Sequence, residues 1–255
     1  MRSVLVIAGN TFREVIRDRI LYGLIVFAIM LLFLSLALGQ LSFDENIRLS
    51  ANFGFTGIHI AVVVLAVFVG STLVSKEIDK QTILTLLARP ISRAQFILGK
   101  SLGLMAVLAV VATGLALILS AFLLFLGFNF TPDYLTAVFG VLLEAAVLLA
   151  LALFFGSFAR PMMTVVYTIA VFLLGHWVES LHFFIKNSES ELFRAVGTAI
   201  TYLVPDLEAF NWRSAPVYAI DIPSGQIVAA VGASTGWVLI LIALTVLIFR
   251  RRDFV

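Results

Sequence analysis

Six long apolar stretches constrain this chain more than any other feature of its sequence. A helix that crosses a bilayer needs roughly 20 mostly apolar residues, and each stretch is close to that length or longer. Hydrophobic residues fill 62% of the 255 positions and charged residues 13%, whereas a soluble domain is about half apolar and a quarter charged. The chain is therefore predicted to be an integral membrane protein. The stretches cover residues 21–41, 55–75, 101–128, 134–158, 164–181 and 226–249.

Backbone amides cannot bond to water inside a bilayer, so each stretch is expected to form a helix. The predicted fold class is an all-α integral membrane protein with six transmembrane helices, in a single domain over residues 1–255. The chain contains no cysteine, so neither a disulfide nor a thiolate-bound metal is expected.

The basic residues predict the orientation of the spans. If the six spans alternate from a cytoplasmic N-terminus, 13 of the 17 lysine and arginine residues lie on the cytoplasmic side. This distribution satisfies the positive-inside rule and puts both termini in the cytoplasm. It also explains the pI near 9.1 without a nucleic-acid partner. The basic residues expected outside are Arg48, Lys186, Arg194 and Arg213.

Residues 1–20 form a basic, amphipathic stretch before the first span. Its apolar side chains share one side of a helical wheel, which predicts an interfacial helix on the inner leaflet. The apolar side consists of Val4, Leu5, Ala8, Phe12, Val15 and Ile16, and the polar side of Asn10, Arg13, Glu14, Arg17 and Asp18.

Residues 76–100 form a cytoplasmic loop that is longer than a connection requires. A short amphipathic helix is predicted before Pro90, which ends it. Ser92 and Gln95 form a capping box for the next helix. The apolar face could rest on lipid or fill a groove on a partner protein. That face consists of Ile83, Leu84, Leu86 and Leu87, opposite Gln81, Thr82, Thr85 and Arg89.

One short motif resembles a phosphate-binding loop. Residues 94–101, AQFILGKS, match the pattern except that Ala94 replaces the first glycine. A true phosphate loop follows a strand, whereas these residues begin a hydrophobic helix. Nucleotide binding is therefore not expected, and we expect Gly99 to allow close helix packing and Lys100 to mark the cytoplasmic boundary.

Residues 182–225 form the other long segment outside the spans. A helix over residues 189–204 is expected in the outer interface or dipping into it. It could act as an external gate or be a surface helix without substrate contact. Its apolar face consists of Leu192, Phe193, Val196, Ala199, Ile200, Leu203 and Val204.

A few polar residues stand out inside or near the predicted spans. Glu144 lies in the middle of the fourth, and it could mark a transport path or bond to a neighbouring helix. His176, Glu179 and His182 could share one stripe near the outer end of the fifth. No metal site is expected, because soft-metal transport would need cysteine or a methionine ladder. No hydrolytic motif is present, so the chain is not expected to be an enzyme.

Two segments together resemble the ABC-2 type transporter permeases: TFREVIRDRILYG, and SKEIDKQTILTLLARPISRAQFILGK followed by the long outer segment before the last span. The resemblance covers essentially the whole chain and is greatest to the permeases associated with multi-copper enzyme maturation. Gln81 stands where many family members have glycine, which fits that branch. The branch does not establish copper as cargo, and the missing soft ligands oppose it.

The resemblance implies a type V exporter-like permease, in which residues 1–20 are an elbow helix, residues 76–100 carry a coupling helix, and residues 182–225 gate the exit. Two permease subunits, identical or paralogous, would work with two cytoplasmic ATPases that bind ATP and Mg²⁺. The chain itself would bind no cofactor. The residues implied to contact the ATPase are Glu77, Leu84, Leu87, Arg89 and Arg93.

The family further implies a multi-pass protein of the bacterial inner membrane, acting in export or in a periplasmic maturation step that could involve an accessory protein. Two other classes stay open on the sequence alone. One is an ATP-independent channel or secondary transporter with Glu144 on its path, although we find neither inverted repeats nor broken helices. The other is a membrane enzyme, disfavoured by the missing catalytic motif.

Overall fold

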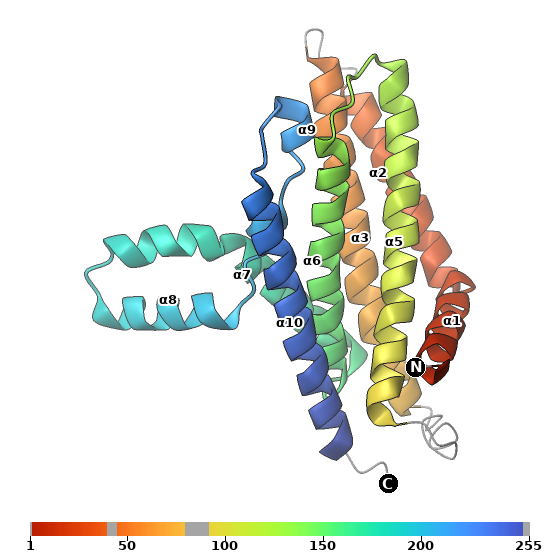
Figure 1. Cartoon of the computed structure of the whole chain (residues 1–255). Coiled ribbons are helices and arrows are strands. Elements are labelled where there is room, and N and C mark those ends of the chain that lie inside the picture. Colours follow the sequence, from red (N-terminus) through yellow and green to blue (C-terminus); the bar gives the residue numbers. More distant parts are fainter. Residues whose placement is uncertain (1, 40–44, 80–91, 252–255) are drawn as a thin grey trace.

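The computed structural model describes residues 2–39, 45–79 and 92–251, which form a bundle of long helices (Figure 1). Six of the described helices are long and apolar enough to cross a membrane, which confirms the predicted number of spans. No strand occurs in the described ranges. The six helices are α2 (Arg19–Gly39), α3 (Asn46–Asp79), α5 (Arg93–Phe125), α6 (Asp133–Gly156), α7 (Pro161–Asn187) and α10 (Ser224–Arg251).

The two ends of the chain lie at the same end of the bundle (Figure 1), as an even number of crossings requires. The positive-inside rule predicts that this end faces the cytoplasm. The loop between α5 and α6 lies at the opposite end, which we call the outer end.

Helix α6 lies at the centre of the bundle, between α3, α5 and α10 (Figure 1). The most apolar stretch of α6 is 61% buried inside the structure, whereas the corresponding stretches of α2 and α10 are 19% and 17% buried. A helix that is apolar all round and buried forms a core, and the exposed apolar faces of α2 and α10 suit contact with lipid.

Helix α1 (Arg2–Ile16) packs along the cytoplasmic end of α5. The two helices meet at glycines: a Cβ on Gly99 would lie 2.7 Å from Ile7, and a Cβ on Gly103 would lie 2.6 Å from the Ala8 carbonyl oxygen. Small residues four apart let helix backbones approach closely, so the prediction of close packing at Gly99 is confirmed. The buried stripe of α1 is Ile7, Thr11 and Val15.

This stripe differs from the predicted apolar side of α1. Leu5, on the predicted apolar side, is 67% exposed, as expected for a side chain that faces lipid. Thr11 is buried because it faces the space above Gly103. The wheel predicted the side for the inner leaflet, whereas the face against α5 is determined by the shape of α5.

The first turn of α5 is capped as predicted. The Ser92 hydroxyl accepts a hydrogen bond from the Gln95 amide, and the Ser92 amide donates to the Gln95 side chain at 3.1 Å. This capping box satisfies amides that a helix start leaves unpaired. Helix α5 therefore begins inside the predicted loop of residues 76–100, shortly after Pro90.

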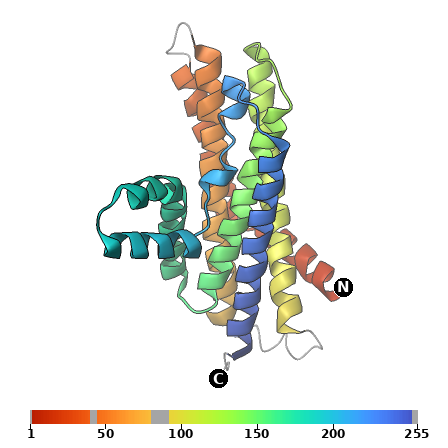
Figure 2. The same ribbon diagram turned by 60° about the vertical axis from the view of Figure 1, so that its left-hand side comes forward.

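The outer part of α7 and helix α8 (Glu191–Leu203) form a hairpin that points away from the bundle (Figures 1 and 2). Ile185 of α7 packs over Gly197, the one buried residue of α8. From α8 the chain returns to the bundle through the 3-10 helix η1 (Glu208–Phe210) and the short helix α9 (Ala215–Tyr218), and then enters α10.

Candidate functional site

The stretch that returns from α8, residues 205–213, is called the external segment below. It lies against two glycines of the spans. A Cβ on Gly175 of α7 would lie 2.8 Å from the Pro205 carbonyl oxygen, and the Leu207 amide donates to the Gly175 carbonyl at 3.2 Å. Gly140 of α6 faces the Phe210 carbonyl oxygen in the same way. These close approaches hold the external segment against α6 and α7.

Glu144 is the most deeply buried acid near this contact, with a side chain 2% exposed. Its Oε2 lies 2.8 Å from Nε2 of His59, which comes from α3. Its Oε1 lies 3.6 Å from Nε2 of His176, which comes from α7. One carboxylate therefore faces imidazoles from two other spans.

The partners of His59 determine where its proton lies. Arg213 places Nη1 2.7 Å from Nδ1 of His59, and a guanidinium can only donate hydrogen bonds. Nδ1 of His59 therefore accepts, and Nε2 carries the proton that is donated to Glu144. Burial lowers the pKa of Arg213 from its usual value, while the charges of Glu144 and Glu208 raise it.

The external segment supplies the remaining polar groups. Asn211 donates from Nδ2 to Oε1 of Glu208 at 2.6 Å and accepts from Nε of Arg213 at 2.8 Å. Oε2 of Glu208 lies 4.0 Å from Nε2 of His176. We call the whole set the polar cluster; it consists of His59, Glu144, His176, Glu208, Asn211 and Arg213.

The structure brings together two of the four polar residues singled out in or near the spans. Glu144 and His176 both belong to the polar cluster. Glu179 is exposed on α7, and His182 bonds to the Val178 carbonyl oxygen, so the proposed stripe does not converge. His59 was not among the predicted site residues, although a histidine between the apolar residues of a span is a visible signal in the sequence.

The residues implied to contact the ATPase fall mostly outside the description. Leu84, Leu87 and Arg89 lie outside the described residues, and so does the side chain of Glu77. Arg93 is described: its Nη1 donates to the Phe249 carbonyl oxygen at 2.6 Å. The start of α5 is thereby bonded to the cytoplasmic end of α10.

The four residues predicted for an external gate lie on the hairpin. Leu192, Phe193 and Val196 of α8 are 76%, 43% and 51% exposed, and Ile200 is half-buried. The apolar face of α8 therefore remains largely uncovered by the described part of this chain.

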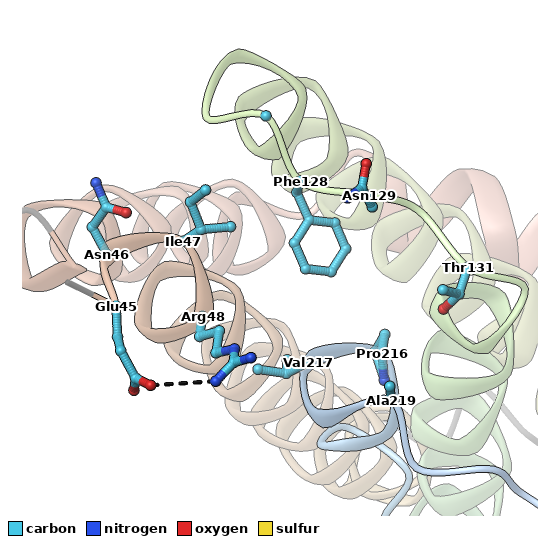
Figure 3. Close-up of a pocket in the computed structure, with 11 residues that line it drawn as sticks. Glu45, Asn46, Ile47, Arg48, Phe128, Asn129, Thr131, Pro216, Val217 and Ala219 are labelled. Carbon is cyan, nitrogen blue, oxygen red and sulfur yellow. Dashed lines mark hydrogen bonds and ion pairs between the residues drawn. The ribbon is translucent and has the colours of Figure 1, made fainter.

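A pocket of about 560 Å³ with a mixed polar and apolar lining opens at the outer end of the bundle, where Figure 3 shows the start of α3, the loop after α5, and α9 around it. Its one drawn ion pair joins Glu45 to Arg48 at 3.3 Å, and both side chains are more than half exposed. A surface pair of this kind contributes little energy. The pocket offers no converging buried groups, so the polar cluster is the stronger candidate site.

The polar cluster can hold charge between the spans and tie an outer segment to them. Three imidazole or carboxylate atoms of His59, Glu144 and His176 lie within 4.8 Å of one another. Polar groups inside a membrane protein are costly and mark functional positions.

The comparisons with known proteins support the architecture. The chain matches the ABC-2 family transporter protein family over residues 5–254. No curated protein matches it. The match covers nearly every residue, and the fold supplies the six spans of a permease. The chain therefore belongs to the ABC-2 family of transporter proteins, as a multi-pass membrane protein.

Proposed function

We propose that this chain is the permease subunit of an ABC transporter and that it couples ATP hydrolysis by a separate cytoplasmic ATPase to movement of its outer helices. The observation that supports this most strongly is the bracing of α5. This helix begins at Arg93, inside the predicted coupling loop of residues 76–100, and is bonded to α10 through Phe249. It also holds α1 at Gly99 and Gly103. A displacement of the coupling segment would move all three helices together.

The finer assignment follows the sequence resemblance. We propose two permease copies with two ATPases in a bacterial inner membrane. They would act in export or in a periplasmic maturation step, as in the branch associated with multi-copper enzyme maturation. The uncovered apolar face of α8 supports a role for the hairpin at a boundary with lipid or with the second copy.

The ATPase contact can be tested by affinity purification from native membranes followed by mass spectrometry. The test variant is Leu84→Asp/Leu87→Asp, which puts charge on the apolar face of the predicted coupling helix. The matched control is Thr82→Asp/Thr85→Asp, which puts the same charge on its polar face. Both variants must insert as well as the wild type, measured by their abundance in the membrane fraction.

We expect an ABC ATPase to co-purify with the wild type and the control and to be lost from the test variant, because a buried charge at a partner groove is costly. Equal recovery of the ATPase in both variants would contradict a coupling role for this face. Absence of any ATPase from all three samples under gentle conditions would contradict the proposed function itself.

A further inference from the structure

A groove lies between α5 and α6, which run side by side and are joined by a loop at the outer end of the bundle (Figure 1). It has a volume of about 460 Å³ and an almost entirely apolar lining. Its walls are exposed: Leu117 of α5 is 64% exposed and Leu135 of α6 is 74% exposed. The groove therefore opens to whatever surrounds the bundle at this level.

The length of α5 gives the depth of the groove in the membrane. Lys100 lies beside the interfacial helix α1, with Nζ 3.9 Å from Glu14, and is expected at the cytoplasmic boundary. The helix from Lys100 to Ser120 rises about 30 Å, which is the thickness of the hydrocarbon core. On α5 the groove is lined by residues between Thr113 and Ser120. It therefore lies in the outer half of the core.

Two polar groups in the lining are already bonded within the protein. The Tyr134 hydroxyl donates to the Ala116 carbonyl oxygen at 2.6 Å, and the Ser120 hydroxyl donates to the Leu117 carbonyl oxygen at 2.9 Å. The rest of the lining is mainly aliphatic and aromatic. The groove thus suits a hydrocarbon ligand and offers little to a polar one.

The shape of the groove indicates which hydrocarbon fills it. Water is absent from the bilayer core, and an empty groove would cost its lining the contacts of one side. From Thr131 to Leu142 the lining covers a rise of about 16 Å, and half of the hydrocarbon core is about 15 Å. We propose that the groove binds one acyl chain of an outer-leaflet phospholipid, whose headgroup lies beside the loop between α5 and α6.

A chain in this groove would be held more firmly than lipid on the other exposed faces. It would contact the walls at Leu117 and Phe139 and the floor at Ala116 and Val138, which are 7% and 9% exposed. A lone helix face offers contact on one side only. Lipid tails are as apolar as these side chains, so the preference comes from van der Waals contacts. The bound chain would fill the space between the outer halves of α5 and α6.

A second copy of the chain is the other possible occupant, and the position of the groove argues against it. The hairpin of α7 and α8, which we place at a boundary with lipid or with the second copy, projects from the side of the bundle away from α5 in both views (Figures 1 and 2). A copy that meets the hairpin would leave the groove open to lipid. This proposal depends on membrane insertion and not on the proposed transport function.

The test uses the full chain in vesicles of phosphatidylethanolamine and phosphatidylglycerol, with a trace of phosphatidylglycerol that carries a diazirine midway along one acyl chain. Photolysis attaches the probe where it contacts protein, and mass spectrometry locates the attachments. The filling variants are Thr113→Phe and Leu142→Trp, which enlarge side chains of the lining on α5 and on α6. Ile118→Phe is the matched control, because Ile118 is 45% exposed on α5 and lies outside the lining. Size-exclusion profiles report folding.

We expect the wild type to be labelled mainly within residues 113–120 and 130–142, severalfold more densely than the exposed faces of α2 and α10. This labelling should fall severalfold in both filling variants and remain unchanged in Ile118→Phe. Three results would overturn the proposal: equal labelling density on α2 and α10, wild-type labelling in either folded filling variant, or an equal fall in Ile118→Phe. If one filling variant fails to fold, the other keeps the test decisive.

A second measurement separates lipid from a second copy of the chain. Leu135→benzoylphenylalanine puts a photoreactive side chain on the exposed wall of the groove. We expect its adducts to be with phospholipid. Adducts that join two copies of the chain would show that a second copy covers the groove, and they would overturn the proposal.

Discussion

Two glycine-based contacts attach segments outside the spans to this bundle, and they differ in chemistry. At the cytoplasmic end, Gly99 and Gly103 receive α1 through an apolar stripe. Nearer the outer end, Gly140 and Gly175 receive the external segment, and that contact closes over the polar cluster. In both places the missing Cβ of glycine allows a close backbone approach. The result is a mainly apolar contact between α1 and α5, and a charged, hydrogen-bonded site under the external segment.

The difference suggests separate roles for the two contacts. The contact of α1 with α5 depends mainly on shape, because the ion pair between Lys100 and Glu14, at 3.9 Å, involves a largely exposed carboxylate. Such a contact can transmit movement as a packed unit. The polar cluster contains a buried carboxylate whose stability depends on each of its partners. We therefore expect the cytoplasmic contact to remain closed during a cycle and the outer contact to be the one that responds to changes in its neighbours.

The largest expected effect comes from removing His59. The variant His59→Leu leaves the buried Glu144 carboxylate without its donor, which we expect to lower the free energy of unfolding by about 3–5 kcal/mol. Thermal unfolding in detergent measures the loss. The double variant His59→Leu/Glu144→Leu should recover much of it, because the uncompensated charge is then gone. No recovery would mean that packing, not charge, dominates this contact.

The stability of the contact between α1 and α5 should instead depend on side-chain volume at its glycines. In Gly103→Ala the new Cβ would lie 2.6 Å from the Ala8 carbonyl oxygen, so we expect a loss of about 1–3 kcal/mol from overpacking. The same change at Gly114, in open space on the same helix, should be neutral or stabilising by up to about 1 kcal/mol. Thermal unfolding of both variants measures the contrast, and equal effects would contradict a close contact at Gly103.

The outer contact should show a similar but smaller response. Gly175→Ala would press on Leu207 and Pro205, and the external segment can shift more easily than a packed helix. We expect a loss near 1 kcal/mol, at the lower end of the overpacking range, and faster proteolysis within residues 205–213. Gly232→Ala, which meets nothing within 4 Å, is the control. Unchanged proteolysis in Gly175→Ala would argue against a tight contact.

A change of similar size to that in Gly175→Ala is expected at the start of α5. Ser92→Ala removes the hydroxyl that caps the Gln95 amide, and the loss of such a cap costs about 1 kcal/mol. Thermal unfolding measures the change, and Ser101→Ala in the same helix is a control because its hydroxyl bonds to the Leu98 carbonyl oxygen and not to an amide of the helix start. A loss in Ser101→Ala as large as that in Ser92→Ala would contradict a specific capping role.

Much of the fold could be predicted because its signals are local. Hydrophobic length predicts the six spans, and Ser92 with Gln95 predicts the start of α5. The polar cluster could not be assembled in this way. His59 and Glu144 are 85 positions apart, and His59 and Arg213 are 154 apart. Their meeting depends on the packing at Gly140 and Gly175, and nothing in the spacing of the charged residues indicates which histidine faces which carboxylate.

We propose that ATP-driven movement at the cytoplasmic end of the bundle changes the position of the hairpin formed by α7 and α8. The absence of native cysteine in this chain allows a clean test with single introduced cysteines, Leu192→Cys on α8 and, as a control, Leu135→Cys at the start of α6. Both positions are about three-quarters exposed, at 76% and 74%. The reaction rate with a membrane-impermeant maleimide is measured on the complex with its ATPase, with and without ATP and vanadate.

We predict that trapping with ATP and vanadate changes the rate at position 192 severalfold and leaves the rate at position 135 unchanged. Equal rates at position 192 in both states, in a complex that hydrolyses ATP, would contradict the account.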